Sequence, residues 1–129
     1  MRRTAVGICL LALTCPLSSL GPDAAARPSV TGIFSDMYYS AEGGDVVGIE
    51  VFIMYTNQGY YATFQIAEGV PSVPALVQVS VDGVNVSFSV PEAQGGGMFR
   101  GHVTARALVG TLEEGRDPLN LKRGKSYWQ

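Results

Sequence analysis

The chain has 129 residues, of which 16% carry charged side chains, and its formal net charge at pH 7 is −2. This length suits one small domain. Nucleic-acid binding depends largely on clustered Lys and Arg that neutralise phosphates. Beyond the N-terminus the only local concentration of basic residues is Lys122, Arg123 and Lys125. We therefore predict that the protein does not bind nucleic acid.

The N-terminus has the pattern of a secretory signal peptide. Arg2 and Arg3 precede an apolar stretch at 5–20, and small residues before and at Ala26 suit cleavage after that position. The stretch is short for a membrane span, which needs roughly 20 apolar residues, and Pro16 interrupts it. The pattern therefore indicates export by signal peptidase cleavage.

We expect the signal peptide at residues 1–26 to be removed. Residues 27–129 then form a single exported domain, periplasmic or secreted, with no membrane span. Both cysteines, Cys9 and Cys15, belong to the removed part, so the mature chain has no disulfide and depends on apolar burial. A lipoprotein anchored at Cys15 is the alternative, although Thr14 before it fits that pattern poorly.

The rest of the chain has the pattern of consecutive β-strands. Apolar and polar residues alternate with period two, and turn-forming residues separate the runs. In the run 46–56 the odd positions from Val47 to Tyr55 are all apolar and are expected to face a core. Asp82-Gly83 is a strong hairpin signal. The expected strands are 30–39, 46–56, 60–67, 75–81, 84–90, 98–105, 108–112 and 119–122.

About eight short strands with short turns predict an all-β fold: an antiparallel up-and-down, lipocalin-like barrel. A two-sheet β-sandwich is the alternative, but it usually has longer crossover connections. Interior glycines at Gly48, Gly101 and Gly110 are expected at barrel corners. Polar outward positions and short strands argue against an outer-membrane barrel. These outward positions are Asn85, Ser87, Ser89, Arg100, His102, Thr104, Asn120 and Lys122.

Three segments carry a resemblance to a known design. They are Gly44-Asp45-Val46-Val47-Gly48-Ile49-Glu50, Phe99-Arg100-Gly101-His102-Val103, and Leu119-Asn120-Leu121-Lys122-Arg123 ahead of Tyr127-Trp128. The chain is similar to the compact lipocalin-like or avidin-like barrel modules of small exported bacterial proteins. It departs from true lipocalins, whose first strand carries Gly-x-Trp, because Phe34 follows Gly32-Ile33. The resemblance implies the fold and carries no assigned activity.

No constellation for catalysis, a metal or a cofactor is evident. His102 is the only histidine, the mature chain has no Cys, and no Gly-x-Ser-x-Gly motif occurs. His102 is expected to face outward from a strand. Glu50 lies mid-strand and either faces outward in a cross-strand pair or faces the lumen, where it pairs with Arg100 or Arg106 and reads a polar ligand. An enzyme would require Glu50 in a water-poor cavity, so we predict a non-catalytic protein.

The first functional hypothesis is the binding of a small apolar or aromatic ligand at the barrel mouth. It predicts an accessible cavity with few polar groups. The expected lining residues are Phe64, Phe88 and Phe99.

The second hypothesis is a protein-binding module, for example an inhibitor of an envelope enzyme, and a purely structural role is a further alternative. A binding module predicts a packed interior and an exposed aromatic patch. Tyr and Trp suit such a patch because one end is apolar and the other can hydrogen-bond. The expected contact residues are Tyr39, Tyr61 and Trp128, with Glu50 as a possible polar contact.

Overall fold

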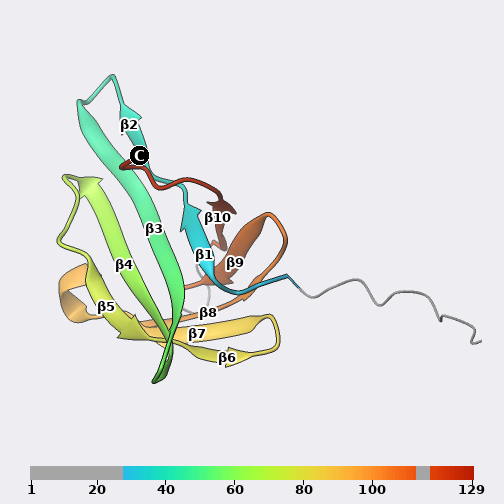
Figure 1. Cartoon of the computed structure of the whole chain (residues 1–129). Coiled ribbons are helices and arrows are strands. Elements are labelled where there is room, and N and C mark those ends of the chain that lie inside the picture. Colours follow the sequence, from blue (N-terminus) through green and yellow to red (C-terminus); the bar gives the residue numbers. More distant parts are fainter. Residues whose placement is uncertain (1–27, 113–116) are drawn as a thin grey trace, which may run out of the picture.

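The computed structural model describes residues 28–112 and 117–129; the expected signal peptide lies outside the described residues. Ten β-strands form one antiparallel sheet that curls into a nearly closed barrel (Figure 1). The strands are β1 (Gly32–Ser35), β2 (Tyr38–Ser40), β3 (Asp45–Thr56), β4 (Gly59–Gly69), β5 (Ala75–Gln78), β6 (Ser80–Asp82), β7 (Asn85–Ser89), β8 (Met98–Val103), β9 (Ala107–Thr111) and β10 (Leu119–Arg123). In the described part of the chain one 3-10 turn, η1 (Glu92–Gln94), precedes β8.

The strand order is β5-β4-β3-β1-β10-β9-β8-β7-β6, with β2 paired only to β3. The predicted antiparallel barrel is therefore confirmed, and the sandwich alternative is wrong. The strand number exceeds the expected eight because two expected strands are each divided. The first breaks at Asp36-Met37 into β1 and β2, and the fourth breaks at Val79 into β5 and β6.

The break at Val79 lets one stretch of chain join the two ends of the sheet. β5 hydrogen-bonds to β4, whereas β6, directly after Val79, hydrogen-bonds to β7. The amide of Val79 itself still donates to the carbonyl of Tyr60 at 2.9 Å. The bend thus brings the first and second halves of the chain together and nearly closes the barrel.

The break at Asp36 has a local cause. The Asp36 amide donates to the Ile49 carbonyl at 3.1 Å, but the Ile49 amide donates to the Asp36 carboxylate at 2.6 Å instead of to its backbone. Gly48 opposite has φ +120°, and a Cβ there would lie 2.8 Å from the Cα of Met37. Beyond this point β2 and β3 continue as a hairpin that protrudes from the barrel (Figure 1).

The interior is one packed hydrophobic core. Gly101 of β8 pairs with Gly110 of β9, and the Phe99 ring lies over both. A Cβ would lie 2.8 Å from that ring at Gly101 and 2.6 Å from it at Gly110. These two glycines therefore admit an aromatic ring. The largest fully buried side chains are Phe34, Phe64, Phe99, Ile53, Leu108, Leu121, Val51 and Val103.

The ends of β3 correct one sequence expectation. Ile49 in the middle of the strand is buried as expected, but Val47 is 36% exposed and Tyr55 is 70% exposed. With 12 residues, β3 extends past the core at both ends. Val47 lies on the protruding hairpin, and Tyr55 packs edge-to-face on Tyr60 at a centroid distance of 4.9 Å near the opposite hairpin turn. Period two thus predicted the side of the sheet and not the limits of the core.

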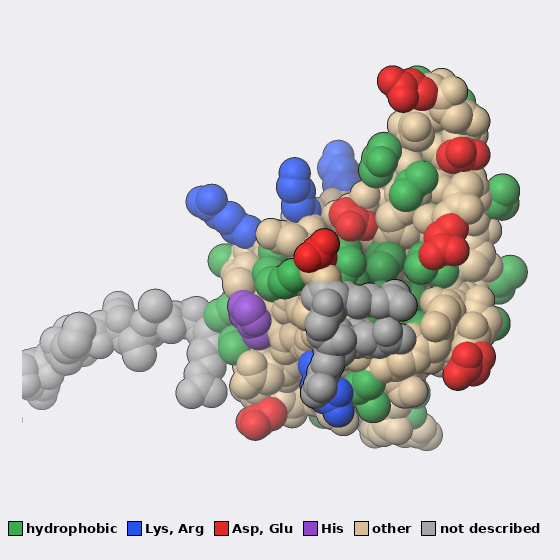
Figure 2. All heavy atoms as spheres, turned by 180° about the vertical axis from the view of Figure 1, so that it is seen from behind, with side chains coloured by type: hydrophobic (Ala, Val, Ile, Leu, Met, Phe, Trp, Pro, Cys, Tyr) green, Lys and Arg blue, Asp and Glu red, His purple; other side chains and the backbone are tan. Residues whose placement is uncertain are grey.

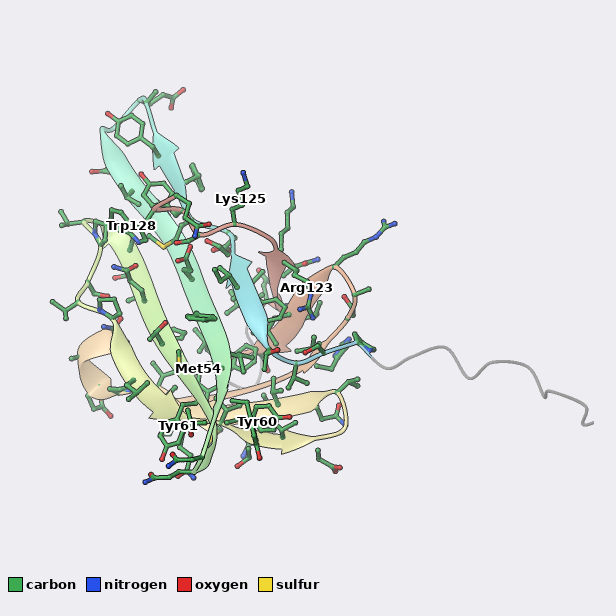
Figure 3. The ribbon with its side chains drawn as sticks, in the orientation of Figure 1. Met54, Tyr60, Tyr61, Arg123, Lys125 and Trp128 are labelled. Carbon is green, nitrogen blue, oxygen red and sulfur yellow. The ribbon has the colours of Figure 1, made fainter. Side chains whose placement is uncertain are left out.

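Arg123 covers the end of the core opposite the protruding hairpin (Figure 3). Its guanidinium lies 4.7 Å from the centroid of the Phe34 ring. It donates hydrogen bonds to the carbonyls of Thr31 at 2.8 Å, Ser29 at 2.5 Å and Thr104 at 3.2 Å. The first residues of the domain and the β8–β9 turn are therefore held together over the core.

Candidate functional site

The interior of the barrel is filled by stacked aromatic rings. Phe88 stacks on Phe99 with centroids 4.8 Å apart, and Phe64 lies 5.9 Å from Phe88. None of the three is more than 2% exposed. The three phenylalanines expected to line a ligand cavity are thus core residues, and attention turns to the outside of the barrel.

One outward face of the barrel is apolar. It is formed by β1, β3, β4 and β5 together with the C-terminal segment 124–129, and we call it the apolar wall. Phe52 is 41% exposed, Leu76 66% and Trp128 59%. Figure 3 shows Trp128, Met54 and Tyr61 distributed along β3 and β4. The outward side chains of the apolar wall are Ile33, Phe52, Met54, Tyr61, Pro74, Leu76 and Trp128.

The opposite outward face, formed by β7, β8, β9 and β10, is mainly polar, with Met98 of β8 and Val109 of β9 as its apolar side chains. His102 is exposed on it, as predicted. The expectation of a polar exterior is therefore right for these strands and wrong for β3 to β5. We call this face the polar wall; its outward side chains include Asn85, Ser87, Ser89, Arg100, His102, Asn120 and Lys122.

Glu50 anchors the C-terminal segment onto the apolar wall. After β10 the chain turns back across the outside of β3. One Glu50 carboxylate oxygen accepts a hydrogen bond from the Ser126 hydroxyl at 2.6 Å, and the other accepts from the Tyr127 amide at 2.7 Å. Glu50 therefore faces outward, as one of the two readings had it, but its partners are Ser126 and Tyr127 of the tail rather than a charge on a neighbouring strand. The alternative of a lumen-facing Glu50 paired with Arg100 or Arg106 is wrong.

Gln65 on β4 fixes the end of this tail. Its side-chain carbonyl accepts a hydrogen bond from the Trp128 indole N–H at 2.9 Å, while its amide nitrogen donates to the Ser72 carbonyl at 2.7 Å. Gln65 is only 8% exposed although it points outward. Trp128 in turn stands edge-to-face against Tyr127 at 5.0 Å. The indole is thus held in place with much of its surface still open.

A groove of about 440 Å³ lies beside the held indole. Of its four polar lining side chains, Glu50, Gln65 and Ser126 already bond within the chain as described, and Thr63 is the fourth. The surface that remains available to a ligand or partner is mainly apolar. The lining residues are Ile33, Glu50, Phe52, Thr63, Gln65, Pro74, Ser126 and Trp128.

A second groove of about 350 Å³ continues the first along the strands, and Met54, Tyr61 and Leu76 line it. Phe52 pairs with Thr63, and Met54 pairs with Tyr61 two residues further along. Outward side chains two residues apart on a strand are about 7 Å apart. The two grooves therefore form one elongated apolar surface from Trp128 to Tyr61.

Gln94 of η1 supports the edge of the wall and has no counterpart in the sequence predictions. It is 5% exposed. Its side-chain oxygen accepts from the Ile66 amide at 3.2 Å and from the Ser72 hydroxyl at 2.6 Å, and its nitrogen donates to the Val73 carbonyl. Gln94 thus completes the hydrogen bonding of β4 where β5 no longer pairs with it. A glutamine in a Gly-rich loop gave no periodic signal.

The predicted contact residues fall into three places. Glu50, Tyr61 and Trp128 come together on the apolar wall. Tyr39 is 59% exposed on the protruding hairpin opposite Val46 and lines neither groove. The three phenylalanines lie in the core. Sequence reasoning missed Phe52 and Leu76, although the apolar even positions of the run 46–56 carried a signal for the first.

Within residues 28–112 and 117–129, no cluster of three or more His, Cys, Asp or Glu side chains could hold a metal ion. No helix in this part of the chain has the length and apolar character to cross a membrane. The resemblance to lipocalin-like modules stays a prediction beyond the barrel fold itself. Comparison of the chain with protein-family models, curated proteins and solved structures finds no match.

Proposed function

We propose that this is an exported, non-catalytic binding protein whose apolar wall docks a partner protein. The carrying observation is that several large apolar side chains are exposed together on the apolar wall, Phe52, Leu76 and Trp128 among them, whereas Met98 is the one large hydrophobic side chain that is exposed on the described strands of the polar wall. Contiguous exposed apolar patches on monomers mark interaction surfaces. The filled interior supports the same conclusion, because it leaves the outside for recognition.

The chemistry of the wall indicates what the partner presents. Apart from Glu50, whose two oxygens bind the tail, the residues that line the two grooves carry no charge. An aromatic anchor beside an apolar groove is the composition of an interface hot spot. We therefore expect the partner to insert apolar or aromatic side chains between Trp128 and Leu76.

A small aromatic ligand in the first groove is the second candidate. The groove volume of about 440 Å³ lies in the range of small-molecule sites. This candidate keeps the ligand hypothesis but moves its location from the barrel interior to the outside of β3 and β4.

The test begins with a photo-crosslinking amino acid at Leu76, which is 66% exposed, and at Asn85 on the polar wall as the matched control. The exported protein is irradiated in its producing cells, and the crosslinked partner is identified and purified. Its Kd is then measured for the wild-type chain, for Phe52→Ser and for the polar-wall variant Ser87→Ala.

We expect adducts from position 76 and not from 85, and a Kd that rises about 10-fold or more in Phe52→Ser while Ser87→Ala binds as the wild type does. Equal crosslinking from both walls, or an unchanged Kd in Phe52→Ser, contradicts the proposal. If the only adducts join two copies of this chain, the apolar wall is a homodimer interface and no other partner protein docks there.

Export is tested separately by the mass of the protein outside the cytoplasm. Cleavage after Ala26 predicts a chain that begins at Arg27. A chain that retains residues 1–26, or one that begins at a lipid-modified Cys15, contradicts this part of the proposal.

A further inference from the structure

Apart from the two grooves, a cavity of about 220 Å³ lies at the open end of the barrel, on the inner side of the protruding hairpin. Its floor is apolar: Val47 and Ile49 of β3, Ile66 of β4 and Leu119 of β10 line it. Ile49 is the last buried core residue of β3 on this side, and Val47, Ile66 and Leu119 continue the inward face of the sheet beside and beyond it. We call this cavity the mouth.

The rim of the mouth is acidic. Asp36 and Glu68 line it, and no Lys or Arg from the described part of the chain does. Two further acids belong to the same hairpin: Glu42 lies in its turn, and Asp45 begins β3 opposite Ser40. Figure 2 shows hydrophobic side chains in the hollow below the hairpin, with Asp and Glu side chains near it and Lys and Arg side chains along the edge farther from the hairpin. The hairpin side of the mouth, where Asp36 and Glu68 lie, therefore favours cations over anions.

An exposed aromatic side chain faces the same side as these groups. Tyr38 pairs with Val47, and Val47 pairs with Glu68, so the three side chains form one row across β2, β3 and β4. Tyr38 is 57% exposed. Tyr38 and Glu68 lie two strand spacings apart, about 10 Å, so the ring offers a π face to a cation at the hairpin edge of the mouth rather than next to the carboxylate.

We propose that the mouth binds a short apolar chain that ends in a cation, an alkylammonium or alkylguanidinium group. The apolar floor buries the chain, while Glu68 and the Asp36 carboxylate face the charge and Tyr38 stands on the hairpin outside the lining. The volume lies below the 300–1,000 Å³ of drug-sized sites, so the occupant is small. A free amine and a Lys or Arg side chain of another protein share this chemistry. The mouth is separate from the apolar wall and stands independently of the proposed docking.

The experiment follows backbone amide shifts of the exported chain during titration with n-butylammonium at constant ionic strength. 1-Butanol and butyrate are the neutral and anionic counterparts of the same chain length. Glu68→Gln removes one rim charge, and Asp82→Asn removes an exposed acid at β6, which does not line the mouth. Asp36 is left intact because it bonds to the Ile49 amide.

We expect shifts at Val47, Ile66 and Glu68, and an affinity order of butylammonium, then butanol, then butyrate. Glu68→Gln should lower the affinity for butylammonium about 3-fold and leave the affinity for butanol unchanged, because one exposed charge pair contributes on the order of 0.2–1 kcal/mol. Asp82→Asn should bind as the wild type does. Butanol that binds as tightly as butylammonium, an unchanged affinity in Glu68→Gln, or shifts confined to other regions would overturn the proposal.

A last titration separates the two sources of the cation and uses Nα-acetyl-lysine methylamide, which presents the same ammonium on a peptide. An affinity within about 3-fold of butylammonium supports a protein side chain as the occupant. Binding of butylammonium alone supports a free amine.

Discussion

The apolar wall and the polar wall cover the same core, yet they face the surroundings with different chemistry. On β7 the inward Val86 and Phe88 alternate with outward Ser87 and Ser89, and each outward residue is hydrophilic. On β3 the inward Val51 alternates with outward residues that include Phe52 and Met54. Closing a barrel requires only the inward series. The outward apolar series on β3 to β5 is therefore surplus to folding, which is why we connect it with binding.

The walls also differ in what lies upon them. The C-terminal tail crosses the apolar wall and binds Glu50 and Gln65 there, while η1 supports its edge through Gln94. On the polar wall, by contrast, Ser87, Arg100 and His102 make no hydrogen bond to another side chain within the described residues. Each of the four predictions that follow substitutes residues of one wall, or of the core beneath it. The effect on stability is then compared with that of a control substitution elsewhere.

The largest effect is expected under the polar wall, where the Phe99 ring fills the space above two glycines. Gly110→Ala would place a Cβ against the Arg100 carbonyl and 2.6 Å from the ring. We expect the free energy of unfolding to fall by about 3 kcal/mol or more, because backbone and ring must both shift. Urea unfolding followed by far-UV circular dichroism measures it. Gly124→Ala, which meets nothing within 4 Å, is the control and should change little.

The next effect compares the two sides of one strand in the apolar wall. Val77 points inward and is 7% exposed, whereas its neighbour Leu76 points outward and is 66% exposed. Val77→Ser should lower the free energy of unfolding by about 2–3 kcal/mol, since it places a hydroxyl in the core. Leu76→Ser should change it by less than about 0.5 kcal/mol. Equal losses in chemical unfolding would show that Leu76 belongs to the fold.

A smaller loss is expected when the tail is released from the apolar wall. Glu50→Ala removes the acceptor for two donors, and we expect a loss of about 1–3 kcal/mol in the free energy of unfolding. Because the chain has a single Trp, its fluorescence reports the tail directly, and the emission of Trp128 should shift to longer wavelength. Glu50→Gln, which retains one acceptor, should give an intermediate result. Emission identical to the wild type would show that Glu50 does not hold the tail.

The smallest effect is expected on the polar wall itself. His102→Ala and Ser87→Ala remove exposed or half-exposed side chains that make no hydrogen bond among the described residues. Each should change the free energy of unfolding by no more than about 0.5 kcal/mol. A loss as large as that of Glu50→Ala would mean that the polar wall carries a contact of its own.

The period-two pattern predicted the fold class, and the reason is physical. Inward positions such as Ile53, Val86 and Phe88 must be apolar in a barrel with a packed core, so the sequence alternates between apolar and polar residues. The Asp82-Gly83 signal was also right, with the turn itself at Gly83-Val84 between paired Asp82 and Asn85. Rules that consider only residues close in sequence were sufficient for strands and turns that depend only on such residues.

The strand breaks could not be predicted in the same way. At Asp36 a side-chain carboxylate replaces a backbone acceptor, and at Val79 the chain changes neighbours from β4 to β7. Both depend on strands that are distant in sequence. Period two continues through Val79, and at Asp36 the one sign is a charged residue on the inward series of Val30 and Phe34, which does not by itself reveal the bond to Ile49.

The site was predicted only in part for a related reason. Glu50, Tyr61 and Trp128 were correctly selected by residue type, but their meeting requires the tail to fold back over β3 after β10 has paired with β1. No periodicity marks a six-residue tail without strand structure. The role of Gln94 was hidden in the same way, because it is defined by contacts across the fold.

The most direct test of the central claim, that apolar recognition takes place outside a filled barrel, is a titration of the ¹⁵N-labelled exported chain with benzyl alcohol, an uncharged aromatic probe. We predict that the largest shifts occur at the amides of Phe52 and Leu76 and at the indole N–H of Trp128, while Phe88 and Phe99 change little. Shifts centred on Phe88 and Phe99, or spread equally over both walls, would contradict the account.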